Sequence, residues 1–143
     1  MRSTVFVLDS WPLVAWFKNQ EPGASRTDTL LENARAGKSE LLINVVNVGE
    51  VYYSVAKASG LEMAERALQT IYSLPIKIIS TSDEQVMRAA RLKGKYPIAY
   101  GDAFAALIAM ERHAPVVTGD KELRDLGKRG VVSVEWVGEM EPQ

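Results

Sequence analysis

The chain has no cysteine and only one histidine, His113, among its 143 residues. Without thiols it has no disulfide framework and no thiolate site for zinc or an iron–sulfur cluster, and this absence fits a reducing cytoplasm. His113 precedes Ala114-Pro115 near the expected end of a helix, where a histidine is most often a surface residue. Catalysis by a histidine acid or base is therefore not expected.

Long apolar runs and a charge imbalance are also missing. No segment approaches the ~18–20 apolar residues of a membrane span. The apolar stretch near the start meets Asp9 too soon for a signal peptide, so we expect a cytoplasmic protein without membrane contact. The formal net charge is −1, so nucleic-acid binding would need a local basic patch or bound metal ions. The length suits one domain, residues 1–143, with a polar tail from about residue 136.

Apolar runs alternate with helical patterns along the chain. Residues 4–8 are an uninterrupted β-branched and aromatic run, typical of a strand buried on both faces. Ser10 and Pro12 supply a helix cap and a first-turn proline for a helix that reaches residue 17. We expect further strands at 41–43, 76–79, 115–118 and 131–134, and further helices at 25–36, 46–59, 61–74, 83–93, 101–112 and 121–126. This alternation predicts an α/β sandwich around a mostly parallel sheet.

Four acidic residues stand where an apolar segment ends or a helix begins: Asp9, Glu50, Asp102 and Asp120. Asp9 closes the first expected strand, and Asp120 follows the fourth by two residues. Glu50 and Asp102 lie in the first turns of two helices. In such a sheet, ligands bind beyond the carboxyl ends of the strands, so all four side chains can reach one edge. A cluster of oxygen ligands alone suits Mg²⁺ or Mn²⁺.

Each acid also has a plain structural explanation. Asp9 suits a helix cap, and Asp102 suits the positive end of a helix dipole. Glu50 fits a solvated helix position, and Asp120 fits a turn after Gly119. Each explanation is adequate by itself, but the need for four at once favours a shared site.

Four segments carry these acids: Val7-Leu8-Asp9-Ser10, Asn44-Val45-Val46-Asn47-Val48-Gly49-Glu50-Val51-Tyr52-Tyr53, Tyr100-Gly101-Asp102-Ala103-Phe104-Ala105-Ala106-Leu107-Ile108-Ala109 and Val116-Val117-Thr118-Gly119-Asp120-Lys121-Glu122-Leu123. The ordered set resembles the PIN-domain nucleases and, within them, the VapC-type toxins of prokaryotic toxin–antitoxin pairs. The likeness covers nearly the whole chain. One such segment alone would be weak evidence, whereas the ordered set is strong evidence.

The resemblance implies a PIN-like three-layer fold, with a five-stranded sheet of order 3-2-1-4-5 and helices on both faces. It implies an endoribonuclease that hydrolyses phosphodiester bonds in RNA with Mg²⁺ or Mn²⁺. The expected partners are an RNA substrate, a small cognate antitoxin protein and a second copy of the toxin. Some relatives carry another acid shortly after the third one. Here Ala103 to Ala106 follow Asp102, which gives less support to a second, fully occupied metal site.

Mapped by the resemblance, the catalytic positions are Asp9, Glu50, Asp102 and Asp120. We expect Asp9, Asp102 and Asp120 to hold the metal ion, directly or through water. Glu50 is expected to orient the attacking water or to hold a second ion. The supporting residues are Thr118, which commonly supports the last acid, Asn47, one helical turn before Glu50, and Ser10.

RNA binding needs local positive charge, and the candidates are Arg88, Arg91, Lys93, Lys95 and Lys121. Such runs are equally typical of solvated helix faces. If they flank the acids, they would contact phosphates on either side of the scissile one.

Other functions built on a similar fold fit less well. A haloacid-dehalogenase-type phosphotransferase needs a second aspartate two residues after Asp9, where Trp11 stands. A response-regulator receiver needs an aspartate after the third strand, and Ile79-Ser80-Thr81 offers none. The alternative that stays open is a non-catalytic PIN-like scaffold that binds RNA or a protein partner.

Overall fold

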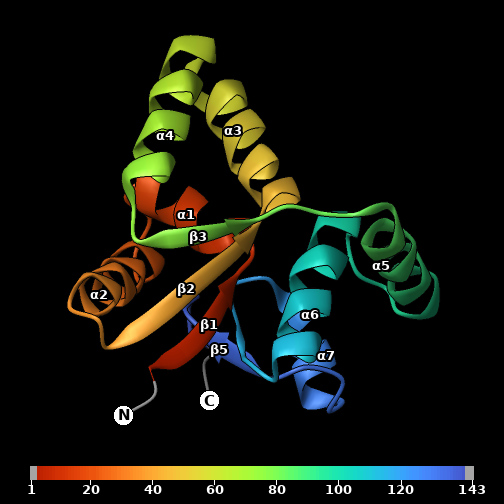
Figure 1. Ribbon diagram of the computed structural model, residues 1–143. Helices are drawn as coiled ribbons and strands as arrows, with labels where there is room; N and C mark the ends of the chain where they lie inside the picture. The colour runs from red at the N-terminus through yellow and green to blue at the C-terminus, as the bar shows by residue number, and fades with distance from the viewer. Residues whose placement is uncertain (1–2, 141–143) are drawn as a thin grey trace.

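The computed structural model describes residues 3–140 and contains a five-stranded sheet flanked by helices (Figure 1). The strands are β1 (Thr4–Leu8), β2 (Ser39–Asn44), β3 (Ile76–Ile79), β4 (Val116–Thr118) and β5 (Val134–Trp136). They lie in the order β3-β2-β1-β4-β5, and every neighbouring pair is parallel. The fold class and strand order expected from the sequence are therefore confirmed.

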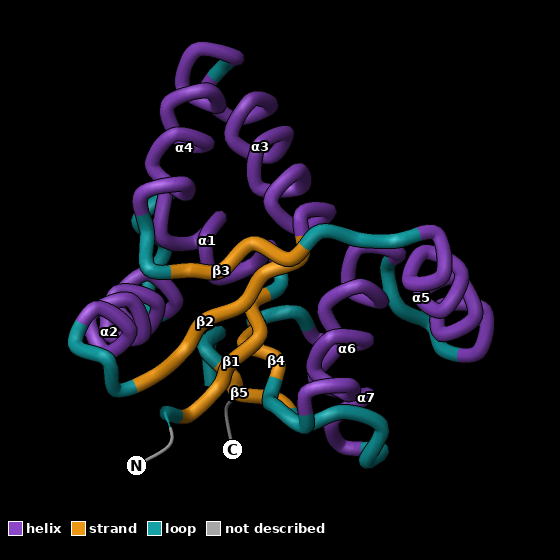
Figure 2. The backbone as a smooth tube through the Cα atoms, viewed as in Figure 1, coloured by secondary structure: helices purple, strands orange, loops and turns teal. Residues whose placement is uncertain are grey.

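Seven helices in the described part of the chain form the two outer layers: α1 (Ser10–Phe17), α2 (Gly23–Arg35), α3 (Val45–Ser59), α4 (Leu61–Ser73), α5 (Asp83–Lys95), α6 (Tyr100–Arg112) and α7 (Lys121–Lys128). Figure 2 shows α1 to α4 on one side of the strands and α5 to α7 on the other. Within the described residues, no helix is both long enough and apolar enough to cross a membrane.

The strands divide the core into two halves. Val7 faces the half built with α5, α6 and α7, whereas the next residue, Leu8, faces the half built with α1 to α4. Leu42 and Leu41 alternate in the same way on β2. Because successive side chains of a strand point to opposite faces, a parallel sheet covered on both faces requires such continuous apolar runs.

Side-chain caps start four helices immediately after strands or turns. Asp9 accepts a hydrogen bond from the Trp11 backbone N–H, and Asn44 accepts one from that of Val46. Ser82 and Gln85 form a reciprocal capping box, and Asp120 caps α7. The expectation that Ser10 caps α1 is wrong, because the preceding carboxylate takes that place and Ser10 is already helical.

The last strand differs from the expectation. Residues 131–134 were expected to form it, but β5 is Val134–Trp136, paired with β4 from Val116 to Thr118. The Val131 N–H instead donates to the Leu126 carbonyl, which ties this residue to the end of α7. The polar tail therefore cannot begin at residue 136, because Trp136 is in the strand and Val137 is buried. The end of that expected tail, residues 141–143, lies outside the described residues.

Candidate active site

Asp9 is fixed at the carboxyl end of β1 by two hydrogen bonds. Its Oδ1 accepts from the Trp11 backbone N–H at 3.0 Å, and its Oδ2 accepts from the Thr118 hydroxyl at 2.6 Å. The side chain is 1% exposed, and burial raises its pKa well above the usual range. The charges of Asp102 and Asp120 raise this pKa further, whereas the two hydrogen bonds oppose the rise.

Asp120 follows β4 and caps α7. Its Oδ1 accepts hydrogen bonds from the backbone N–H groups of Glu122 and Leu123, at 2.7 and 3.3 Å. Its own backbone N–H donates to the Thr118 hydroxyl at 2.9 Å. Thr118 was expected to support this last acid. It bonds the backbone of Asp120, while its hydroxyl proton goes to the carboxylate of Asp9.

Asp102 lies in the first turn of α6 and is the least satisfied acid of the group. Its side chain is 6% exposed, and its buried Oδ2 has no hydrogen-bond partner in the described part of the chain. Burial raises the pKa of Asp102 to about 7, with help from the charges of Asp120, Glu50 and Glu122. An unpartnered buried carboxylate oxygen is costly, so this geometry favours a cation beside it.

Glu50 on α3 is held against the start of α6. The Asn47 side-chain amide donates to Glu50 Oε1 at 2.8 Å and to the Gly101 carbonyl at 3.0 Å. A Cβ atom at Gly101 would overlap the Glu50 carboxylate, so only glycine permits this approach. The expected contact between Asn47 and Glu50 is therefore present, and the hydrogen bond from Asn47 to the Gly101 carbonyl ties α3 to α6 beside Asp102.

The four acids expected from the sequence come together around Asp102. The charges of Glu50 and Asp120 raise the pKa of Asp102, and the charge of Asp102 in turn raises the pKa of Asp9. Ser10, the remaining supporting candidate, is the first residue of α1 and lies next to Asp9 in the chain. The structure thus gathers residues that are about a hundred positions apart at the carboxyl edge of the sheet.

Glu122 is a fifth acid that sequence reasoning did not assign to the site. One carboxylate oxygen from each of Asp102, Asp120 and Glu122 lies within 4.8 Å of the others. The signal in the sequence was its place two residues after Asp120, at the start of α7. Asp9 is outside this group, and both of its carboxylate oxygens already accept hydrogen bonds.

Tyr53 is a second neighbour that the sequence did not single out for the site. It lies one helical turn after Glu50 on α3 and is largely exposed. Burial of part of the ring raises the pKa of its phenol, and so do the nearby charges of Glu50 and Asp102. Tyr53 therefore lies close to the same carboxylates.

The basic candidates are exposed, and three of them have partners within the chain. Arg88 pairs with Glu84 and Glu111, both at 3.0 Å, and the Lys93 ammonium donates to the Ile98 carbonyl at 2.9 Å. The Lys95 ammonium lies 5.5 Å from the Tyr96 ring centroid. Arg91 on α5 and Lys121, which follows Asp120, are exposed. Lys121 therefore lies next to the acids because it follows Asp120 in the chain. Arg88 and Lys93 instead bind two glutamates and a backbone carbonyl of the same protein.

The donor set fits a hard divalent cation. It consists of carboxylate oxygens, one of them buried and unpartnered, with no sulfur and no histidine among them. Close carboxylates repel one another when ionised, and a bound Mg²⁺ or Mn²⁺ would relieve that repulsion.

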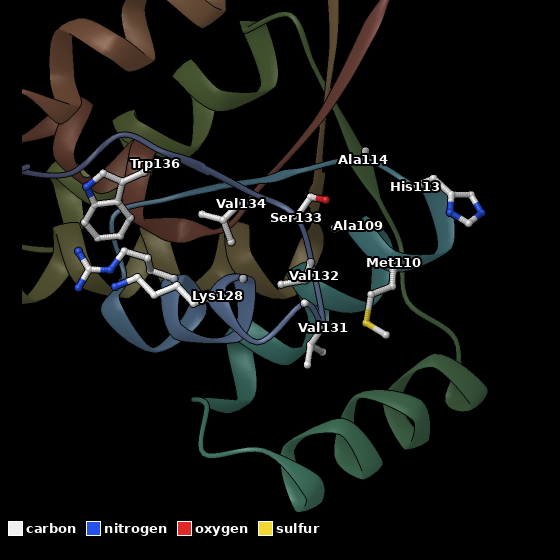
Figure 3. Close-up of a pocket in the computed structure, with 13 residues that line it drawn as sticks. Ala109, Met110, His113, Ala114, Lys128, Val131, Val132, Ser133, Val134 and Trp136 are labelled. Atoms are coloured by element: carbon white, nitrogen blue, oxygen red, sulfur yellow. The ribbon is translucent and has the colours of Figure 1, made fainter.

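Two cavities lie away from the four acids and Glu122. One of about 860 Å³ is formed by the end of α6, by α7 and by the segment leading into β5. Figure 3 shows Trp136 and Lys128 at one end of it and Met110 and His113 at the other. No acidic residue of the described range 3–140 lines it, and His113 is exposed as expected. The other cavity, of about 900 Å³, lies on the opposite side of β5 beside α2.

Comparison with known proteins gives a consistent result. Residues 6–129 match the family model described as the PIN domain. No curated protein sequence matches the chain.

Solved structures with the same fold include VapC20 of Mycobacterium tuberculosis, described as a Sarcin-Ricin loop cleaving toxin. It has a TM-score of 0.70 at 13% identity, covering 87% of this chain and 95% of that one. Two others come from DNA-bound toxin–antitoxin complexes. VapBC of Salmonella typhimurium has a TM-score of 0.68 at 17% identity, and VapBC2 of Rickettsia felis has 0.67 at 18%. Each of these two matches covers 93% of this chain and 98% of the chain in the solved structure.

Proposed function

This chain belongs to the PIN-domain family, and we propose that it is an Mg²⁺- or Mn²⁺-dependent endoribonuclease, the toxin of a VapBC-type toxin–antitoxin pair. The proposal treats residues 1–143 as one PIN-like domain acting in the cytoplasm. It goes beyond the family membership in the metal, the RNA substrate, the catalytic residues, the role as the toxin of a pair and the cellular location.

One observation carries the proposal. The buried Oδ2 of Asp102, at the start of α6, has no partner among the described residues, and the carboxylates around it come from α3, from the β4–α7 turn and from the start of α7. A folded chain that needed these acids only as helix caps would have no reason to gather them or to leave this oxygen unbonded.

The residues divide into three roles. Asp102, Asp120 and Glu122 would hold the divalent ion, with Asp9 acting through a water because its oxygens are already engaged. The bound ion supplies a water of lowered pKa and neutralises charge on the phosphoryl oxygens. Glu50, fixed by Asn47, orients the attacking water, and Thr118 and Ser10 support Asp9.

RNA is the proposed substrate, and an antitoxin is the proposed protein partner. The support comes from the solved structures of the same fold, one described as cleaving the Sarcin-Ricin loop and others as VapBC complexes. We also propose that the chain forms a homodimer. The exposed cations Arg91, Lys95 and Lys121 are the candidates for phosphate contacts outside the acid cluster, with Arg88 and Lys93 contributing less because of their internal partners.

The experiment is an RNA cleavage assay. The purified protein is incubated with single-stranded and hairpin RNAs in Mg²⁺ or Mn²⁺, with EDTA and the Asp9→Asn variant as controls. We expect cleavage with the metal and none in either control. Metal binding without cleavage of any RNA would instead favour a non-catalytic PIN-like scaffold.

A further inference from the structure

A cavity of about 470 Å³ opens beside the acids, and residues next to two catalytic candidates form its wall. Trp11 lies two residues after Asp9, and Gly119 and Lys121 flank Asp120 in the chain. Trp136 and Glu139 complete the wall from β5 and the segment after it, and Glu21 from the α1–α2 connection. We call this cavity the Trp11 pocket. Its volume is within the ~300–1,000 Å³ of typical small-ligand sites.

The Trp11 pocket lies at the carboxyl edge of the sheet. Trp11 follows β1, Gly119 follows β4, and Trp136 ends β5, and these three strands are neighbours. Substrates of such sheets bind outside the carboxyl ends of the strands. A polynucleotide with one phosphate at the acids would therefore carry an adjacent nucleotide past this pocket.

Glycines allow the backbone to pack closely against the rings of both tryptophans. A Cβ atom at Gly23 or at Gly119 would overlap the indole of Trp11. A Cβ atom at Gly138 would lie 2.8 Å from Cζ2 of Trp136. The Trp136 indole N–H also donates to the Glu139 carbonyl at 3.0 Å. Because the rings are ordered before a ligand arrives, stacking on them costs little further entropy.

The charges around the Trp11 pocket favour a neutral ligand. Glu21 and Glu139 contribute two carboxylates, and Lys121 is the one cation among the described residues that line the pocket. The Arg124 guanidinium lies 4.6 Å from the Trp136 ring centroid, behind that wall residue. A phosphate would meet both carboxylates in the pocket, whereas the flat indoles suit a neutral aromatic ring. Unpaired RNA bases are commonly recognised by stacking on aromatic side chains.

We propose that the Trp11 pocket binds one unpaired nucleobase of the RNA, adjacent to the scissile phosphate, by stacking on Trp11. This inference rests on the proposed ribonuclease function and adds a subsite to it. Lys121, exposed at the rim, contacts the phosphate that joins this nucleotide to the one at the acids. The subsite makes cleavage depend on an unstacked base and so excludes regular duplex RNA.

The first test is a binding measurement with fluorescein-labelled single-stranded RNA octamers, made in the Asp9→Asn background with Mn²⁺ so that the RNA stays intact. We expect Trp11→Leu to weaken the affinity roughly 5- to 150-fold, as for loss of one stacked base. The matched control is Trp16→Leu on the same helix, whose ring packs on Phe17 at 5.1 Å and whose N–H bonds Asp28. It should leave the affinity unchanged.

The second test leaves the pocket intact. In a Trp16→Phe variant of the same background, the two remaining tryptophans, Trp11 and Trp136, both line the pocket. Saturating RNA should quench their fluorescence, and an unchanged signal at saturation would overturn the inference. This measurement decides the matter if Trp11→Leu does not fold.

The outcomes separate the two proposals. Cleavage by the wild-type protein, with no quenching and full affinity in Trp11→Leu, would leave the nuclease function standing and remove the subsite. Quenching and weakened binding without wild-type cleavage would keep the base pocket and remove the nuclease function. Failure of the Asp9→Asn protein to bind any of the octamers would overturn the subsite.

Discussion

The Thr118 hydroxyl lies 2.6 Å from Oδ2 of Asp9 and joins residues 109 positions apart in the chain. The Thr118 hydroxyl oxygen also accepts a hydrogen bond from the backbone N–H of Asp120 at 2.9 Å. A hydroxyl has one proton to donate, and here the proton goes to Asp9, because the Asp120 N–H can only donate whereas the Asp9 carboxylate oxygen accepts. One buried group thus fixes the first acid of the site relative to the last.

Replacing Thr118 by valine should weaken both the fold and the site. The variant keeps the shape but leaves the Asp120 N–H without its acceptor and Asp9 Oδ2 without its donor. We expect the free energy of unfolding to fall by about 1–3 kcal/mol in urea titrations. RNA cleavage should fall as well. Thr118→Ser keeps the hydroxyl and should retain most of the activity, so equal losses in the two variants would contradict the role of the hydrogen bonds.

Asp102 should account for most of the stabilisation by metal. Mn²⁺ should raise the melting temperature of the wild-type protein, because only the folded state gathers the carboxylates. Asp102→Asn should lose most of this increase, yet melt no lower than the wild type in EDTA, since it removes a repelling charge. Asp125→Asn is the matched control, because Asp125 is exposed on α7 and does not belong to the group of Asp102, Asp120 and Glu122. If Mn²⁺ raised the melting temperature of Asp102→Asn by as much as that of the wild type, Asp102 would be excluded as a ligand.

The raised pKa of Asp102 predicts a pH dependence of stability in EDTA. The folded carboxyl has a pKa of about 7 against 3.8 for the free group, so the folded state holds more protons between these values. Stability should therefore fall as the pH rises from about 4 to about 7, by about 1–4 kcal/mol from this group, and stay level above.

The measurement is the difference in unfolding free energy between the wild type and Asp102→Asn across this pH range, which removes the contribution of other carboxyl groups. The raised pKa of Asp9 acts in the same direction, and most of it is present in both proteins, because its largest cause is burial rather than the charge of Asp102. A difference that does not change with pH would show that Asp102 is ionised throughout.

The sequence was sufficient for the parts of the fold that depend on local patterns. The apolar run before Asp9 predicts a buried strand, and the carboxyl-edge rule then places Asp9 and Asp120 on the same side. The Asn47 contact to Glu50 follows from helical spacing alone. These inferences need one element at a time, together with one general rule about parallel sheets.

Contacts between distant elements were not predictable in this way. Val131-Val132 has the composition of a strand, but the turn after α7 ties Val131 to Leu126, and pairing with β4 begins only at Val134. Glu122 lies beside Asp102 and Asp120 because α7 begins beside α6. The partner of the Thr118 hydroxyl depends on the pairing of β1 with β4. Each of these depends on tertiary packing, which a single sequence does not show.

Gly101→Ala should separate activity from stability. The new methyl group would overlap the Glu50 carboxylate, which is the end of a flexible side chain and can swing away. The fold should survive, because alanine is a better helix former than glycine by about 1 kcal/mol. Glu50 would lose its bond to Asn47, so cleavage should fall as far as it does in Glu50→Gln.

Two comparisons make this prediction specific. Gly94→Ala on α5 adds a methyl group where no heavy atom lies within 4 Å, so it should keep full activity while gaining a similar helix stabilisation. The Gly101→Ala/Glu50→Gln double variant should cleave RNA no more slowly than Glu50→Gln alone, because both changes remove the same carboxylate from its position. Additive losses would mean that Gly101 acts on the site through something other than Glu50.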